Sequence, residues 1–254
     1  MKDAGDARVK SGTRLKKAKA YREPSFINSR DARPLRILAE YLEPKSRFEH
    51  FGLEDTIVFY GSARFKVGNR WYEAARQLAF RLTQWSKALD SKKQRFVVCT
   101  GGGPGIMEAA NRGASEAGGL NVGLSISLPH EEGANAHITR ELVLRFHYFF
   151  MRKFWFAYLA KAVIVFPGGF GTLDEMFEIL TLVQTKKMTK SMPIVLFGTE
   201  YWKEVINFEA LVRHGTINAA DLELFHRTDS VDEAYDWVVS QLTARALDKP
   251  GATL

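Results

Sequence analysis

Cysteine is almost absent from the 254 residues, and this scarcity excludes several kinds of chemistry. A lone Cys99 cannot support a disulfide framework within the chain or a cysteine-rich metal site. It falls in the apolar run Phe96-Val97-Val98-Cys99, so we expect a buried and unreactive thiol. The histidines show neither H-x-x-x-H nor H-E-x-x-H spacing, and we therefore predict no metal site.

Long apolar runs are also missing. No stretch approaches the roughly 18 apolar residues that cross a bilayer, and the N-terminus has no apolar segment typical of a secretion signal. We therefore expect a cytoplasmic protein that does not enter a membrane. Two catalytic motifs are absent as well: the G-x-x-x-x-G-K-[ST] loop of many NTPases and the G-x-S-x-G elbow of many hydrolases.

The net charge of +7 arises largely near the N-terminus. Lysine and arginine crowd the first 22 residues, where Asp3 and Asp6 are the acidic residues. Such an arm could contact nucleic acid, but no aromatic residue precedes Tyr21. We expect residues 1–30 to form a disordered, solvated arm, with nucleic acid not a partner.

Apolar runs typical of buried strands alternate with helical patterns along the rest of the chain. Continuous apolar strands, each followed by a helix, indicate a parallel sheet with helices on both faces. We predict one α/β domain of Rossmann-like class over residues 31–248, which begins with an N-terminal helix (31–42) that Pro44 ends. The predicted strands are 56–60, 95–99, 121–127, 142–144, 162–166, 194–197 and 224–226; the other helices are 70–89, 107–117, 147–160, 172–186, 200–213 and 230–246.

Glycine-rich turns follow three of these strands, at Gly61-Ser62, at Gly101-Gly102-Gly103 and at Gly168-Gly169-Phe170-Gly171. The carboxyl ends of parallel strands share one edge of a sheet, where ligands bind near the point at which the strand order reverses. Each turn alone fits a structural role equally well. Together they favour a phosphate-bearing ligand of nucleotide size.

The third turn belongs to the run Pro167-Gly168-Gly169-Phe170-Gly171-Thr172-Leu173-Asp174-Glu175, which leads from a strand into a helix. Backbone N–H groups and the helix dipole suit a phosphate there. Thr172 could add a donor or cap the helix. Glu175 would not help to bind phosphate, so we interpret it as a group for chemistry or for sugar hydroxyls.

Two further features bear on the ligand. Arg152 and Lys153 interrupt an aromatic helix, and either they face solvent or Arg152 reaches the crevice of Glu175. Classical dinucleotide binding is disfavoured, because the first turn has one glycine and the third turn has Asp174 where G-x-G-x-x-G needs glycine.

Three motifs, which follow one another along the sequence, resemble those of the LOG family of cytokinin riboside 5′-monophosphate phosphoribohydrolases. The resemblance is to the longer, bacterial branch of that family. They are Thr100-Gly101-Gly102-Gly103-Pro104-Gly105-Ile106-Met107-Glu108-Ala109, the pair Arg152-Lys153, and the run 167–175. The resemblance extends over about residues 55–240. It implies hydrolysis of the N-glycosidic bond of a nucleoside 5′-monophosphate, with no cofactor.

The resemblance also implies roles for individual residues. Arg152 and Glu175 would be the catalytic pair, and the turn from Gly169 to Thr172 would hold the 5′-phosphate. Further substrate contacts would come from Gly61, Ser62, Gly101, Gly102, Gly103, Glu131, Lys153, Phe170, Gly171, Leu173, Asp174 and Thr181. The family forms homodimers through the helix after the glycine turn, although its apolar face (Met176, Phe177, Leu180, Val183) fits burial within one subunit equally well.

We therefore predict a hydrolase of AMP or of N6-modified AMP. A non-catalytic nucleotide sensor on the same fold is the alternative, and the intact pair of Arg152 and Glu175 argues against it. An amino-acid decarboxylase would need pyridoxal phosphate on a lysine. Lys153 and Lys161 are the lysines that we place near the site, and neither has a recognisable cofactor context.

Overall fold

A parallel sheet of seven strands organises the computed structural model, which describes residues 18–127 and 133–252. The strands run in the order β4-β3-β2-β1-β5-β6-β7. Their bounds are Thr56–Tyr60 (β1), Val97–Thr100 (β2), Asn121–Ile126 (β3), Val143–Phe146 (β4), Ala160–Val165 (β5), Ile194–Phe197 (β6) and His226–Thr228 (β7). The predicted Rossmann-like α/β class is confirmed.

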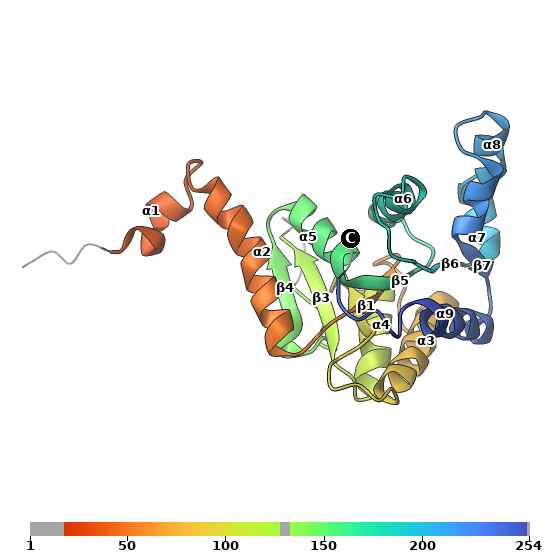
Figure 1. Cartoon of the computed structure of the whole chain (residues 1–254), viewed down its shortest axis with the longest axis horizontal. Coiled ribbons are helices and arrows are strands. Elements are labelled where there is room, and N and C mark those ends of the chain that lie inside the picture. The colour runs from red at the N-terminus through yellow and green to blue at the C-terminus, as the bar shows by residue number, and fades with distance from the viewer. Residues whose placement is uncertain (1–17, 128–132, 253–254) are drawn as a thin grey trace, which may run out of the picture. The chain divides into compact units, whose positions relative to one another are not determined.

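Helices cover both faces of the sheet. One face carries α3 (Arg70–Lys87), α4 (Ile106–Glu116) and α9 (Val231–Arg245), which lie together in the lower part of Figure 1. Their apolar side chains form one core with the alternate strand residues Ile57, Phe59 and Ile164 and with Phe166, which follows β5 directly. The other face carries α5 (Phe149–Leu159) and α6 (Phe170–Gln184), and Tyr60 on β1 contacts Phe156 there at 5.2 Å between ring centroids.

The strand order reverses between β1 and β5, which lie side by side with Phe59 opposite Ile164. Chain connections leave these two strands in opposite directions across the sheet, so their carboxyl ends flank a natural crevice. The turns at Gly61 and Gly168 follow β1 and β5. The topology therefore brings two glycine turns to the position where such folds bind ligands.

Two units divide the chain, Met1–Glu40 and Tyr41–Leu254, and the helix α2 (Arg33–His50) crosses the boundary. The described part of the first unit holds two short helical turns, Ala20–Arg22 and Pro24–Ile27 (α1). Arg36 donates to the carbonyl oxygens of Ile27 and Ser29 at 2.6 and 2.7 Å.

The prediction that Pro44 ends the N-terminal helix is wrong, because α2 continues to His50. Proline inside a helix removes one backbone hydrogen bond. Packing offsets this loss: Phe48 is buried, and its ring lies 5.3 Å from that of Trp155 on α5. Tyr41 stacks on Trp155 at 5.6 Å.

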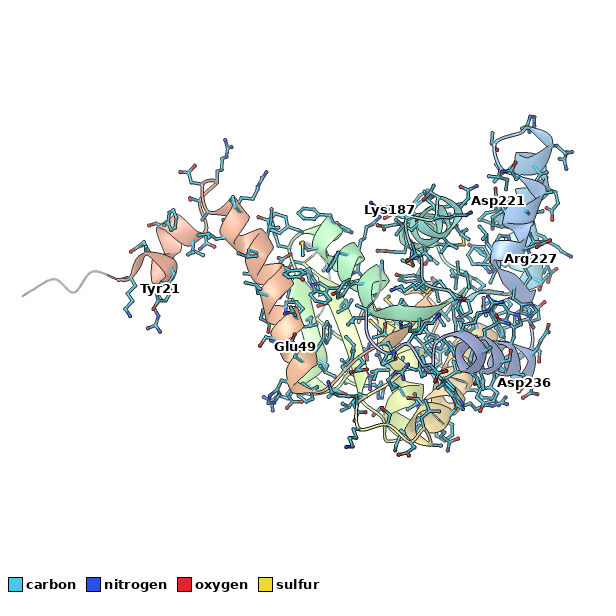
Figure 2. The ribbon with its side chains drawn as sticks, in the orientation of Figure 1. Tyr21, Glu49, Lys187, Asp221, Arg227 and Asp236 are labelled. Atoms are coloured by element: carbon cyan, nitrogen blue, oxygen red, sulfur yellow. The ribbon has the colours of Figure 1, made fainter. Side chains whose placement is uncertain are left out.

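The C-terminal third also departs from prediction. The expected helix 200–213 is two helices, α7 (Thr199–Val205) and α8 (Phe208–Arg213), because Ile206 is extended and the Asn207 side chain caps the second by accepting from Ala210 N. The last strand begins at His226, after a 3₁₀ segment (Ala219–Leu224). Asp221 of that segment, labelled in Figure 2, accepts a 2.7 Å hydrogen bond from Gln184 at the end of α6.

None of the helices in the described residues is long and apolar enough to cross a membrane.

Candidate active site

Backbone hydrogen bonds join the three glycine turns at the carboxyl edge of the sheet. Ser62 N donates to Pro167 O at 3.0 Å, which connects the turns after β1 and β5. Ile106 N donates to Ser62 O at 3.0 Å, which connects the turns after β1 and β2. The Tyr201 hydroxyl donates to Gly168 O at 2.6 Å and holds the third turn from α7. The turns therefore form one preorganised rim.

A cavity of about 700 Å³ opens within this rim. This volume lies within the range of about 300–1,000 Å³ typical of small-molecule sites. Most of the site residues predicted from the sequence line it: Gly61, Ser62, Gly101, Arg152, Gly169, Phe170, Gly171, Thr172, Leu173, Asp174 and Glu175.

The N-terminus of α6 forms one wall of the cavity. Gly169 is its N-cap, and the first hydrogen bond of the helix runs from Leu173 N to Gly169 O. The preceding N–H groups of the first turn have no partner within a helix and can bind an anion. A Cβ built on Gly169 or Gly171 would meet no described atom within 4 Å. The protein itself does not require glycine at these two positions, so the space suits a ligand that approaches the backbone closely.

Arg152 on α5 crosses the site beneath the second turn. Its Nε donates to Leu124 O of β3 at 2.7 Å, and its guanidinium lies 5.2 Å from the centre of the Phe156 ring. A Cβ on Gly101 would lie 2.5 Å from an Arg152 nitrogen, so any larger residue at 101 would displace the guanidinium. The glycine of the second turn therefore makes room for this cation.

Glu175 lies one turn into α6 and faces Arg152. Their side chains are 10% and 14% exposed, and Arg152 Nη1 lies 3.9 Å from Glu175 Oε1. Burial raises the pKa of Glu175 to about 7, although Arg152 and Lys153 favour the ionised form; Glu178 and Asp174 add to the rise. A carboxyl group that titrates near neutral pH in a cavity is suited to proton transfer.

Several predicted residues do not line the cavity. Gly102 and Gly103 are not part of its lining, and the side-chain amide of Asn135 donates to both of their carbonyl oxygens.

Lys153 also does not line the cavity. It joins α5 to α6, with its Nζ at 2.8 Å from Asp174 and 3.1 Å from Glu178. Thr181 is exposed and donates to Phe177 O. The predicted contact Glu131 lies outside the described residues.

Lys161 is far from the position that we expected. It is the second residue of β5, at the opposite end of the strand from the Gly168 turn. Of the two lysines considered for pyridoxal phosphate, Lys153 is therefore paired with carboxylates and Lys161 faces another region. The helix after the glycine turn buries Met176 and Leu180 within the chain and leaves Phe177 39% exposed; the homodimer stays a prediction.

Sequence reasoning missed part of the cavity lining. The further residues are Tyr60, Ala63, Arg64, Phe65, Met107, Phe149, Gly168, Tyr201 and Val205. Tyr60 could have been predicted from its position, because it is the last residue of β1 and directly precedes the turn at Gly61. Tyr201 and Val205 come from α7, and no local motif marks them.

The Tyr60 hydroxyl is buried and has no hydrogen-bond partner among the described residues. We predict that Tyr60→Phe leaves the free energy of unfolding unchanged or raises it by up to about 1 kcal/mol, because an unsatisfied polar group is removed. Urea unfolding measures the effect. A loss of more than about 1 kcal/mol would show that the hydroxyl makes a contact that stabilises the fold.

The fold and the cavity define a class of protein: a Rossmann-like α/β protein whose switch point joins a helix N-terminus to a buried pair of carboxylate and guanidinium.

Comparison with known proteins identifies the family. The family model described as "Possible lysine decarboxylase" matches residues 107–238, more than half of the chain. A rice protein, probable cytokinin riboside 5′-monophosphate phosphoribohydrolase LOG4, is 30% identical over 182 residues, which are 69% of this chain and 72% of the relative. The Arabidopsis thaliana phosphoribohydrolase LOG7 is 26% identical over 221 residues, 82% and 93% of the two chains. The chain belongs to the LOG family, as its motifs indicated.

A solved structure supports the fold. The X-ray structure of TM1055 aligns with a TM-score of 0.52 at 22% identity, and the alignment covers 73% of this chain and 99% of that one.

Proposed function

We propose that the protein hydrolyses the N-glycosidic bond of a nucleoside 5′-monophosphate, giving a free base and ribose 5-phosphate. One observation carries this proposal: the buried Glu175 and Arg152 face the same cavity as the open N-terminus of α6. The LOG-family relatives, which are named as phosphoribohydrolases, support the same reaction class.

The first turn of α6 would hold the 5′-phosphate. Its N–H groups and the helix dipole would attract the phosphate, and the Thr172 hydroxyl would add a donor. Gly169 and Gly171 leave space for the phosphate oxygens. The phosphate is remote from the bond that breaks, so the energy gained by binding it holds the ribose in position for the reaction. The ribose would then extend from the turn toward Glu175, one helical turn away.

Glu175 would act at the bond that breaks. Cleavage of an N-glycosidic bond develops positive charge near C1′, which an ionised carboxylate stabilises. The same carboxylate can orient the 2′ and 3′ hydroxyls and take a proton from the attacking water. Because the pKa of Glu175 is raised to about 7 by burial, kcat/KM should rise with pH through about pH 7 as the active carboxylate forms.

For the base, we propose adenine or an N6-modified adenine. The apolar and aromatic residues Phe65, Met107 and Phe149 line the same cavity and offer a surface on which a flat heterocycle can stack. The two named relatives act, by their names, on cytokinin riboside 5′-monophosphates.

A panel of substrates tests the proposal. The protein is incubated with AMP, N6-isopentenyl-AMP, GMP, CMP and UMP, and with adenosine, and chromatography measures the free base. We expect release from at least one adenine nucleotide and at least a hundredfold less from adenosine, because the phosphate contributes remote binding energy. Tight binding of AMP without release of base would instead indicate a nucleotide sensor. Equal rates with AMP and adenosine would contradict the phosphate site on α6.

A further inference from the structure

A second cavity, of about 460 Å³, lies at the amino end of β5, opposite the candidate active site. Four cationic side chains line it: Lys161 on β5, Lys190 before β6, Arg245 at the end of α9, and Lys249 beyond it. Thr189 and Ser191 add hydroxyl groups to the lining, and no acidic residue of the described chain is part of it.

Lys161 is the most unusual of these residues. It is 2% exposed, in a strand whose other residues are Ala160, Ala162, Val163, Ile164 and Val165. Burying an ammonium group without a partner is costly, and a lysine in such a place is normally paired with a carboxylate. The ion pairs formed by the described residues do not include Lys161.

The nearby carboxylate Asp55 is already engaged. Its two oxygens accept from Arg95 Nε at 2.7 Å and from Phe96 N at 2.6 Å. Asp55 is fully buried and forms an ion pair with Arg95, so its single charge compensates Lys161 and Lys190 only in part. Four basic side chains line the cavity and no carboxylate of the described residues does, so the cavity keeps a net positive charge.

Hydrogen bonds rather than ion pairs position two of the other basic side chains. Lys190 Nζ donates to the carbonyl oxygens of Ala157 and Tyr158 at the end of α5, at 2.7 and 2.8 Å. Arg245 Nη1 donates to the Ser191 hydroxyl at 3.3 Å. Burial and the positive charge of Lys161 together lower the pKa of Lys190 to about 7. An anion in the cavity would remove this repulsion.

We propose that this cavity binds a small, multiply charged phosphate compound, a diphosphate or a phosphate ester. Fixed cations and hydroxyl groups around a concave site match the several acceptor oxygens of such a ligand. The volume of about 460 Å³ accommodates more than one phosphate group. The site is separate from the catalytic cavity, since the two occupy opposite ends of β5.

Inorganic pyrophosphate is the probe, in calorimetric titrations of the whole chain at pH 7.5 and 50 mM salt. All titrations use the Arg152→Ala background, which removes a catalytic cation and keeps the second cavity intact. We expect Lys161→Met to weaken binding by about tenfold or more, because a buried charged contact is lost. The control is Lys187→Gln. Lys187 (labelled in Figure 2) is an exposed lysine in the neighbouring loop and does not line the cavity. Its replacement removes the same charge and should change the pyrophosphate affinity less than about twofold.

Thermal melting separates a binding defect from a folding defect. Without pyrophosphate, Lys161→Met should melt at the same or a higher temperature than the parent, because a buried charge is removed. Pyrophosphate should raise its melting temperature less than that of the parent. Equal pyrophosphate affinity in the Lys161 and Lys187 variants would overturn the proposal, as would no binding to the parent. Neither result bears on nucleotide hydrolysis, which the substrate panel tests separately.

Discussion

Replacing Glu175 by glutamine should lower kcat/KM for the preferred nucleotide by about 10²–10⁴-fold. Glutamine keeps the shape of the side chain and its place beside Arg152, but it cannot carry the negative charge that would stabilise a cationic ribose or accept a proton from water. Steady-state measurement of free base, at pH 8 where Glu175 is mostly ionised, gives the largest difference. The matched control is Glu178→Gln, one turn further along α6, which should retain activity within a few fold.

The same substitution should stabilise the fold. The pKa of Glu175 is about 7 in the folded protein, against an ordinary value of 4.5, mainly because of burial. The folded state therefore prefers the protonated form, and stability is lost as pH rises from the ordinary value through about 7. Glutamine resembles the protonated form and avoids this loss. Urea unfolding should show a gain of about 1–3 kcal/mol at pH 8 and little difference near pH 4.5.

These two results together identify a group that is kept for function at a cost in stability. A variant that is inactive and also less stable at pH 8 would point to a structural role instead. Near-normal turnover in Glu175→Gln would refute the mechanism, because no other carboxylate of the described cavity lining is similarly buried: Asp174 is 58% exposed and paired with Lys153.

Much of the fold could be predicted because its signals are local. Continuous apolar strands such as 162–166 and the helices after them need no knowledge of distant contacts. The glycine turns could be placed at one edge because parallel strands share their carboxyl ends. The order of the strands, with the reversal between β1 and β5, came only from the structure.

The predictions that failed depend on tertiary packing. Pro44 predicts the end of a helix from the sequence, whereas the contact of Phe48 with Trp155 in the structure explains why α2 continues. Lys161 is an exception, because it precedes the predicted strand 162–166. The sequence order alone therefore places it at the amino end of β5, opposite the Gly168 turn. The cavity residues from α7 could not be found, since a helix distant in sequence is carried to the site by β6.

The sequence also could not say which cations reach the cavity. Arg152 and Lys153 are adjacent, yet a helix directs adjacent side chains about 100° apart. One faces the cavity and Glu175, while the other joins α5 to Asp174 and Glu178 on the outside. Only the packing of α5 against β3 decides which of the two is which.

Arg152→Ala should lower kcat/KM by about 10²–10³-fold, the effect of removing one preorganised charge from a buried site. Arg152 is the strongest influence that keeps Glu175 ionised, so its loss should also raise the pKa of Glu175 above 7. The rising limb of kcat/KM against pH should therefore move to higher pH, measured between pH 5.5 and 9.5. Thermal melting at each pH confirms that the variant stays folded.

Arg152→Lys separates two roles for this residue. Lysine retains a positive charge but loses the planar fork and the Nε hydrogen bond to Leu124 O. If Arg152 acts through Glu175, kcat/KM of Arg152→Lys rises over the same pH range as in the parent, and this variant recovers part of the turnover number that Arg152→Ala loses. If Arg152 binds the 5′-phosphate, Arg152→Ala and Arg152→Lys both raise KM, and the pH at which kcat/KM rises is unchanged. A guanidinium at 3.9 Å from the carboxylate, outside hydrogen-bonding distance but close enough for a strong charge interaction, favours the first outcome.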